Sequence, residues 1–257
     1  MDDHDRTREA WSRAGEKYVR EHAEFLEQAR TATLFAHELD LVGSLLAQGP
    51  EVLHPMSGNG VDDHALLHAG AVRVTGLDYD EKAVTSAQER ADTLHAPIRY
   101  LRADVPPFPV PDGSVDLVYT GKGAVVWVAD LDAWAAEAAR VLRPGGHLFV
   151  HEAHPMVPLY DLEAAATRLR DDRGYFAASH VNDTFPAHGA VEWQHPLGEV
   201  VTAVAAAGLT VTVLREHPEP FWRPGDVEAA AWDGRLPNSY SLLAYRRPSS
   251  GAAESGG

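Results

Sequence analysis

The sequence predicts an α/β fold, with a doubly wound sheet of seven strands that is preceded by N-terminal helices and interrupted by a lid insertion. From Glu51 to Val150, short apolar runs alternate with segments of helical period, which is the pattern of right-handed βαβ units with parallel strands. Farther along, two strands are joined by a Pro- and Trp-rich stretch over 218–238 without helical period. We therefore expect these strands to be antiparallel neighbours, with the last strand antiparallel.

Hydrophobic periodicity predicts the elements in order. Apolar residues recur at steps of three and four over 8–30 and 31–47, which predicts two amphipathic helices before the first strand. We expect strands over 51–54, 71–77, 98–102, 115–119, 147–150, 209–214 and 239–245, and helices over 65–70, 80–95, 130–142 and 197–207. The turn Arg143-Pro144-Gly145-Gly146 precedes the fifth strand.

Two segments depart from this alternation. Residues 155–196 have no regular period and hold scattered aromatic residues and histidines, which predicts an insertion over the edge of the sheet that binds ligands. Together with the N-terminal helices, over 1–48, this insertion would form a lid. We expect one domain over 1–247 and a disordered tail over 248–257, which is rich in Ser, Gly and Ala.

Composition excludes several function classes. The chain has 22 Lys and Arg residues against 38 Asp and Glu, a net charge of −16 without a basic cluster, which disfavours nucleic acid and membrane surfaces as partners. Cysteine is absent, so disulfides, thiolate metal ligands and cysteine nucleophiles are excluded. The acidic start lacks the pattern of a signal peptide and no apolar run is long enough to span a membrane, so we expect a cytoplasmic protein.

Residues that follow parallel strands face the crevice where ligands bind. The first strand runs into Ser57-Gly58-Asn59-Gly60, whose glycines let the backbone approach a ligand, although a tight turn without a ligand has the same pattern. Asp78 ends the second strand, where a carboxylate can accept both hydroxyls of a ribose or cap the next helix. Asp104 follows the third strand, where the adenine amino group of a nucleoside cofactor would point.

In this order and spacing, the motifs resemble those of class I S-adenosylmethionine-dependent methyltransferases over about residues 40–150 and 197–246. The resemblance is carried by Val52-Leu53 before Gly58-Asn59-Gly60, Val74 to Asp78, Arg102 to Asp104, Val115 to Tyr119, and Leu142 to Gly146. It implies a Rossmann-like sheet, a methyltransferase domain and S-adenosylmethionine as the cofactor.

The resemblance also implies which residues hold the cofactor. The glycine loop would lie against the methionyl part, Asp78 would bind the ribose hydroxyls, and adenine would lie on Tyr79 with its amino group at Asp104 and the Val105 backbone. To these we add a residue on the inward face of the first helix and one after the fourth strand. The expected cofactor-binding residues are Tyr18, Ser57, Gly58, Asn59, Gly60, Asp78, Tyr79, Asp104, Val105 and Gly121.

The first motif departs from the pattern of the family at two positions. His54 stands where most members have an acidic residue, and Met56 stands where they have the first glycine. The chain is similar in this respect to a branch of the family with a histidine in the first motif. Asp62 would then supply a carboxylate for the ammonium group of the cofactor, or only a favourable charge at the start of a helix.

The acceptor is expected to be a small molecule that receives the methyl group by direct in-line transfer. The segment Thr120 to Trp127 follows the fourth strand, where donor and acceptor meet in this family, although Trp127 also suits a core position. Aromatic residues over 175–232 favour an aromatic or heteroaromatic acceptor, such as an indole or phenol of specialised metabolism, and fit a packed lid as well. The expected substrate residues are Glu38, Lys122, Trp127 and Trp193.

Proton removal is assigned to the end of the fifth strand. Glu152 and His154 share one face of the strand while His151 takes the other, so Glu152 and His154 are the expected catalytic base and its orienting partner. Contact of Glu152 with the N-terminal helices, and a turn at His154, would be the structural alternative. In that case His37, Glu38 and His195 remain as ionisable candidates.

Other functions stay open at this point. A nicotinamide-dependent oxidoreductase is disfavoured by Asp63, which stands where a third glycine belongs, whereas a cofactor-binding regulator without turnover would explain His54 and Met56. His147, His151 and His154 lie close in sequence but lack a carboxylate partner, so no metal is expected. The sequence leaves open whether the chain forms a homo-oligomer.

Overall fold

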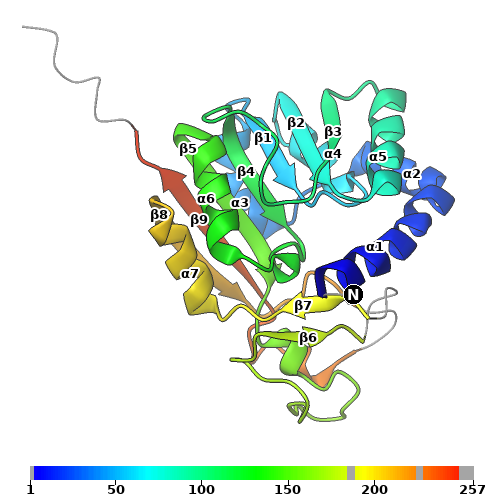
Figure 1. The fold of residues 1–257 in the computed structure, drawn as a ribbon, viewed down its shortest axis with the longest axis vertical. Coiled ribbons are helices and arrows are strands. Elements are labelled where there is room, and N and C mark those ends of the chain that lie inside the picture. The colour runs from blue at the N-terminus through cyan, green and yellow to red at the C-terminus, as the bar shows by residue number, and fades with distance from the viewer. Residues whose placement is uncertain (1–2, 184–188, 224–227, 249–257) are drawn as a thin grey trace, which may run out of the picture.

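A computed structural model describes residues 3–183, 189–223 and 228–248, so part of the predicted insertion and nearly all of the predicted tail lie outside the described residues. Its main sheet has the strand order β3-β2-β1-β4-β5-β9-β8 (Figure 1). The strands are β1 Glu51–Pro55, β2 Arg73–Asp78, β3 Ile98–Arg102, β4 Val115–Gly121, β5 Leu142–Ala153, β8 Leu209–His217 and β9 Ser239–Arg246. The first five are parallel, and β9 runs antiparallel to both β5 and β8, which confirms the predicted fold class.

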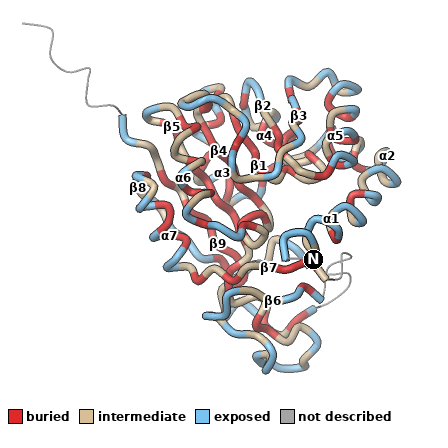
Figure 2. The backbone as a smooth tube through the Cα atoms, in the orientation of Figure 1, coloured by how far each residue is buried: buried red, intermediate tan, exposed pale blue. Residues whose placement is uncertain are grey.

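Helices cover both faces of the sheet because successive strand residues point to opposite sides. In β1, Val52 packs with the helices α3 (Ala36–Leu46), α4 (Val61–His68) and α5 (Glu81–Thr93), while Leu53 packs in a second core with α6 (Leu131–Val141) and α7 (Leu197–Ala206). Buried residues run along the central strands between these two helical layers (Figure 2). No helix among the described residues is long and apolar enough to cross a membrane.

The N-terminal segment forms three helices instead of the predicted two. α1 (Asp3–Arg20) and α2 (His22–Thr31) are separated at Glu21, and α3 begins only at Ala36. The periodicity missed this break because Glu21 is neither glycine nor proline. Tertiary packing explains it: α2 packs on α4 and α5, whereas α1 packs along α5 and reaches on to β7 (Val191–Trp193).

The insertion between β5 and α7 is more ordered than its sequence predicts. Residues Ser179–Val181 (β6) pair antiparallel with β7 and form a separate two-stranded sheet. Thr7 of α1 hydrogen-bonds the backbone of Val191, with its Oγ1 accepting from the amide at 2.9 Å. The first helix and the insertion are therefore joined at the end of the sheet where the parallel strands finish (Figure 1).

Several element boundaries differ from the sequence prediction. β5 begins at Leu142, so it includes the predicted turn, and a register irregularity between Val115 and Leu117 of β4 accommodates this stretch. β8 continues to His217, beyond the predicted end at residue 214. Three short 3₁₀ turns connect elements at Val125–Trp127, Val157–Leu159 and Ala230–Trp232.

Candidate active site

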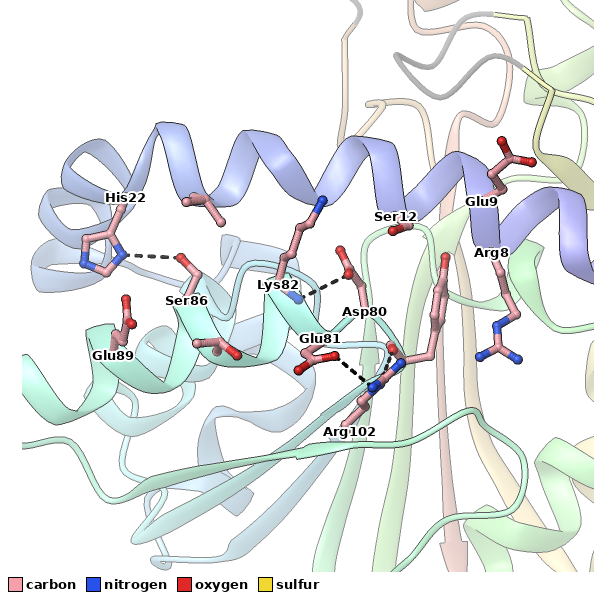
Figure 3. Close-up of a pocket in the computed structure, with 13 residues that line it drawn as sticks. Arg8, Glu9, Ser12, His22, Asp80, Glu81, Lys82, Ser86, Glu89 and Arg102 are labelled. Carbon is pink, nitrogen blue, oxygen red and sulfur yellow. Dashed lines mark hydrogen bonds and ion pairs between the residues drawn. The ribbon is translucent and has the colours of Figure 1, made fainter.

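A cavity of about 330 Å³ lies between α1 and the loops that follow β1, β2 and β4. A larger groove of about 720 Å³ runs along the outer side between α1 and α5 (Figure 3). Mostly charged and polar side chains of the two helices line that groove, and it shares Arg8, Tyr79 and Asp80 with the cavity. The cavity is the better candidate because loops at the carboxyl ends of parallel strands line it.

Asp78 is held at the floor of this cavity by two backbone donors. Its Oδ2 accepts from the amide of Gly58 at 3.0 Å, and its Oδ1 accepts from the amide of Asp80 at 2.9 Å. Burial raises the pKa of Asp78 to about 6, and the two backbone hydrogen bonds oppose this shift. Asp80, not Asp78, caps α5 by accepting from the amide of Lys82, so Asp78 keeps lone pairs for a ligand.

The glycine loop after β1 is a tight turn with left-handed backbone at alternate residues. Met56, Gly58 and Gly60 have φ angles of 57°, 55° and 75°. A Cβ at Gly60 would lie 2.2 Å from the hydroxyl oxygen of Tyr100, so only glycine fits there. Met56 lines the cavity in a conformation that L-residues rarely adopt, which explains why glycine suits its position.

His54, at the end of β1, forms a buried pair with Asp63 of α4. The His54 Nδ1 lies 2.6 Å from the Asp63 Oδ1, and the two side chains are 3% and 0% exposed. Burial lowers the pKa of His54, but the charge and hydrogen bond of Asp63 outweigh it, so the net shift is upward. His54 lines the cavity, and its Nε2 has no hydrogen-bond partner within the described chain.

Helix α1 forms one wall of the cavity. The Oδ2 atom of Asp104 lies 3.0 Å from Nε2 of His4 and 3.2 Å from Nη1 of Arg8. The Arg8 guanidinium also lies over the Tyr79 ring, 5.7 Å from its centroid. These contacts join the first turns of α1 to the ends of β2 and β3.

The loop after β4 forms the opposite wall. Lys122 has a φ angle of 57° and pairs with Asp62 at the start of α4. Its Nζ lies 4.6 Å from the centroid of the Phe35 ring. Trp127 packs edge-on against Trp11 of α1, with ring centroids 5.1 Å apart, so this loop and the first helix meet over the cavity.

Glu152 does not line the cavity but contacts the loop after β4 that forms this wall. Its Oε2 accepts from the amide of Val125 at 2.7 Å, and its Oε1 accepts from the amide of Ala153 at 2.7 Å. Burial raises the pKa of Glu152 to about 7, against the effect of these hydrogen bonds. The carboxylate therefore holds the segment 122–127, and a Cβ at Gly123 would lie 4.0 Å from its Oε1.

Two other expected site residues have their hydrogen bonds elsewhere. His154 accepts from the amide of Met156 on Nδ1, and its Nε2 lies 3.0 Å from the Glu216 carboxylate of β8. Glu38 accepts from the Tyr119 hydroxyl at 2.6 Å and from the amide of Phe35 at 2.7 Å. Burial raises the pKa of Glu38, which completes the first turn of α3.

The structure brings most of the expected cofactor residues together. The expected residues that line the cavity are Tyr18, Ser57, Gly58, Asn59, Asp78, Tyr79, Asp104, Val105 and Gly121, joined by Lys122 and Trp127 from the expected substrate set. Gly60 supports the loop from behind. Within the described part of the chain, Glu38, Glu152, His154 and Trp193 are not among the residues that line the cavity.

Sequence reasoning missed several lining residues. His4, Thr7, Arg8 and Trp11 come from α1, and Phe221 and Trp222 come from the connection between β8 and β9. The placement of Trp11 on the same helical face as Tyr18 was a usable signal, because residues seven apart lie on one side of a helix. Nothing in the local sequence indicates Arg8. Phe221 and Trp222 belong to the aromatic residues over 175–232 that favour an aromatic acceptor, although neither is among the expected site residues.

Comparisons with known proteins agree with this geometry. Residues 53–150 match the family model of a methyltransferase domain. The S-adenosylmethionine-dependent methyltransferase from Mesorhizobium loti superposes with a TM-score of 0.60 at 22% identity, over 81% of this chain and all of that one. Residues 53–150 therefore form a methyltransferase domain, and the chain around them has the class I methyltransferase fold. S-adenosylmethionine is accordingly its cofactor.

Two curated relatives carry named activities. The 27-O-demethylrifamycin SV methyltransferase of Amycolatopsis mediterranei is 34% identical over 58% of this chain and 55% of its own length. The demethylmenaquinone methyltransferase of Thermus thermophilus is 34% identical over 37% of this chain and 44% of its own. The chain thus spans about half the length of these relatives.

The Asp78 carboxylate predicts a pH-dependent affinity for the cofactor. We expect Asp78→Ala to weaken binding of S-adenosylmethionine by about 1.5–3 kcal/mol, because hydrogen bonds to a charged group are lost. Ribose hydroxyls donate to the ionised carboxylate, so affinity of the unaltered protein is lost as pH falls through about 6. Calorimetry from pH 5 to 7, about one unit to either side of the pKa of Asp78, measures both effects.

Asp132→Ala is the matched control, since Asp132 is exposed on α6. We expect it to bind like the unaltered protein at every pH, whereas Asp78→Ala should have a flatter pH profile. Equal affinity of the Asp78 variant and the unaltered protein would remove Asp78 from the site.

Proposed function

We propose that this chain transfers the methyl group of S-adenosylmethionine to a small-molecule acceptor, and that residues 1–247 form a single methyltransferase domain. One observation carries the proposal: the Asp78 carboxylate, oriented by two backbone amides, shares a cavity with the glycine loop and Asp104. The match to a methyltransferase domain over 53–150 supports the same function over a regulatory or nicotinamide-dependent one.

The lining residues fit the parts of the cofactor. Asp78 would accept the ribose hydroxyls, and the Tyr79 ring with Asp104 would receive adenine. The unpartnered Nε2 of His54 would contact the methionyl end of the cofactor, and Asp62, which also lines the cavity, would supply a carboxylate there. The cofactor supplies an electrophilic methyl group on a sulfonium.

In-line transfer requires the acceptor to be held against the methyl group while water is excluded. Lys122, Trp127 and Phe221 line the cavity on the side of the β4 loop, so this side would hold the acceptor. Glu152 would act as a positioning residue, because it binds the amide of Val125 within that loop. Its raised pKa also leaves it able to take a proton near neutrality.

The acceptor is proposed to be aromatic or heteroaromatic, such as an indole or phenol. Four aromatic side chains line the cavity near the β4 loop, namely Trp11, Trp127, Phe221 and Trp222. Trp222 is 46% exposed, so it is available for contact with a ligand. Aromatic surfaces bind flat apolar rings through offset or edge contacts.

Helix α1 and the insertion are proposed to act as a lid. His4 and Arg8 hold Asp104, and Trp11 meets Trp127, so α1 crosses the cavity at two points. Both His4 and Arg8 contact the same oxygen of Asp104, Oδ2. Adenine would replace these partners of Asp104 when it enters, and cofactor binding would then be coupled to movement of α1.

A transfer assay tests the proposed function. The full chain is incubated with methyl-labelled S-adenosylmethionine and a panel of phenols, indoles, amines and aliphatic acids, and the label is located by mass spectrometry. We expect a methylated phenol or indole, and no product with Asp78→Ala at the same cofactor concentration. Binding of the cofactor without transfer to any acceptor would instead support a regulator.

Glu152→Gln tests the role of the buried carboxylate. A glutamine oxygen can accept one backbone amide but its nitrogen cannot accept the other, so the β4 loop should shift. We expect turnover to fall by about 10²-fold with little change in cofactor affinity. His154→Ala is the comparison, since His154 pairs with Glu216, and an equal loss there would place His154 in the reaction.

Trp11→Ala tests the lid. Removing the ring contact with Trp127 should weaken cofactor binding by up to about tenfold, the scale of one aromatic pair. Lys17→Ala, which changes an exposed residue of the same helix, should bind the cofactor like the unaltered protein. Identical dissociation rates of the cofactor from the Trp11 variant and the unaltered protein would contradict the lid.

A further inference from the structure

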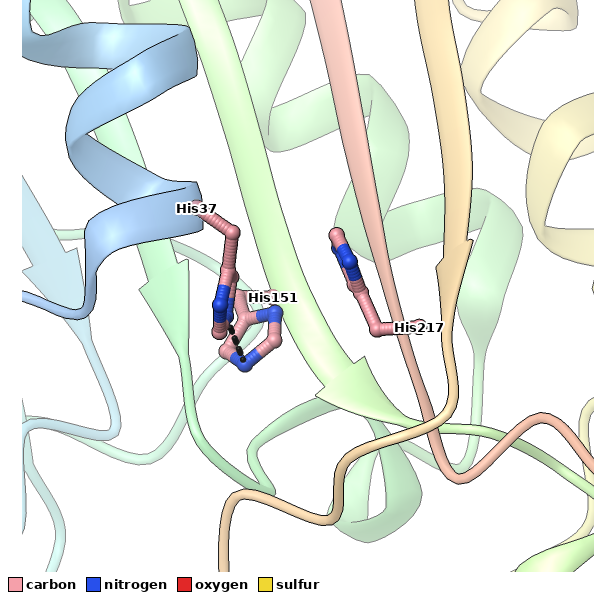
Figure 4. A group of neighbouring side chains, drawn as sticks. All are labelled: His37, His151 and His217. Carbon is pink, nitrogen blue, oxygen red and sulfur yellow. Dashed lines mark hydrogen bonds between the residues drawn. The ribbon is translucent and has the colours of Figure 1, made fainter. Parts of the chain in front are cut away.

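Three histidines from separate elements converge on one point outside the cofactor residues. His37 is in the first turn of α3, His151 is near the end of β5, and His217 is the last residue of β8 (Figure 4). One nitrogen of each lies within 4.8 Å of the other two. The Nε2 atoms of His37 and His151 are 3.1 Å apart. His151 is fully buried and His217 is 7% exposed.

Hydrogen bonds orient the central imidazole. His151 Nδ1 lies 3.1 Å from the Tyr240 carbonyl oxygen and 3.1 Å from the Ser241 hydroxyl. A backbone carbonyl can only accept, so Nδ1 carries the proton and Nε2 presents its lone pair toward His37. A ring nitrogen that donates to a carbonyl while the other faces a shared point is the usual arrangement behind a metal-bound histidine.

Ser241 extends this support to the third ring. Its hydroxyl lies 2.9 Å from Nε2 of His217 as well as 3.1 Å from Nδ1 of His151. One side chain of β9 therefore fixes two of the three imidazoles. No carboxylate is within hydrogen-bond distance of any of the three rings among the described residues.

Burial favours the neutral form of two of the three imidazoles. Burial, followed by the neighbouring charges of His37 and His217, lowers the pKa of His151 to about 3, and burial lowers that of His217. Neutral imidazoles have lone pairs, which is the form that binds metal ions.

We propose that His37, His151 and His217 bind a divalent transition-metal ion, with zinc as the best match. Zinc prefers nitrogen ligands at about 2.0–2.1 Å, so two ligating nitrogens lie about 3.3 Å apart. The His37 and His151 nitrogens already have this separation, at 3.1 Å. All three nitrogens lie within 4.8 Å of one another, so the outer rings must move closer to bind one ion together.

The proposed metal would have an open position near the acceptor side of the cavity. Three protein ligands leave the fourth tetrahedral position for water or substrate. The Phe221 ring, which lines the cavity, lies 5.8 Å from the His151 ring. The amide of Lys122, at the cavity wall, donates to the His151 carbonyl at 2.7 Å. The metal site is thus joined to the cavity wall through two contacts, one of them with the β4 loop. The metal proposal stands independently of methyl transfer.

Metal titration of the full chain tests the site. Protein freed of metal with a chelator is titrated with Zn²⁺ in competition with a chromophoric chelator, and separately with Co²⁺, whose visible absorption reports tetrahedral nitrogen ligation. We expect one equivalent of Zn²⁺ to bind, and His217→Ala to weaken it by about 100-fold or more, since even supporting residues contribute 10–100-fold. His147→Ala is the control, because His147 lies on β5 outside the group.

His37→Gln is the second variant, because His37 is only half-buried and its replacement disturbs packing less. Near-ultraviolet circular dichroism verifies that each variant is folded. Loss of Zn²⁺ binding and of the Co²⁺ band in His37→Gln, with both retained in His147→Ala, supports the site. Absence of stoichiometric binding to the unaltered protein, or equal binding by a folded His37 variant, would overturn the proposal.

Discussion

The Asp78 carboxylate is the contact on which the candidate site depends. It accepts from the amide of Gly58 after β1 and from the amide of Asp80 after β2, so it joins two loops that are neighbours only because β1 and β2 pair in register. The amide of Ser57, which donates to the Leu77 carbonyl at 2.8 Å, adds a second link between the glycine loop and the end of β2. The cost is a buried carboxylate, whose pKa rises to about 6 because two amides replace only part of its hydration.

Closure of the cavity depends on α1 in turn. A Cβ at Gly15 would lie 1.7 Å from Oδ2 of Asp80, so any other residue would push α1 away from the start of α5. This close approach at Gly15 places Tyr18 over Gly58. A Cβ added at Gly58 would lie 3.6 Å from the hydroxyl oxygen of Tyr18. The same approach brings Arg8 to Asp104. The helix is therefore held by close packing at Gly15 and by an exposed ion pair at Arg8. The end that contains Arg8 can separate from the rest of the protein more easily.

Residues at strand ends could be predicted from the sequence, because the fold itself brings them together. Asp78 and Gly58 needed only the alternation of strands and helices to be placed at one edge. Arg8 could not be predicted, since it reaches the cavity through the break at Glu21. Phe221 could be placed only within an aromatic stretch, because it lies in an irregular connection. Proximity in sequence gave no signal for the histidine group either: His147, His151 and His154 are near in the chain, yet His151 meets His37 and His217.

The local rules that this chain breaks are concentrated around the same cavity. Positive φ angles at residues other than glycine occur among the described residues at Met56, His95 and Lys122. His95 follows the end of α5, where a left-handed residue satisfies helix carbonyls, so it needs no other reason. Met56 and Lys122 have no such reason, and each costs about 1–2 kcal/mol. Both line the cavity, next to His54 with its unpartnered nitrogen. Two strained residues and an unpartnered imidazole nitrogen in one cavity indicate a site that a ligand completes, independently of any resemblance to known proteins.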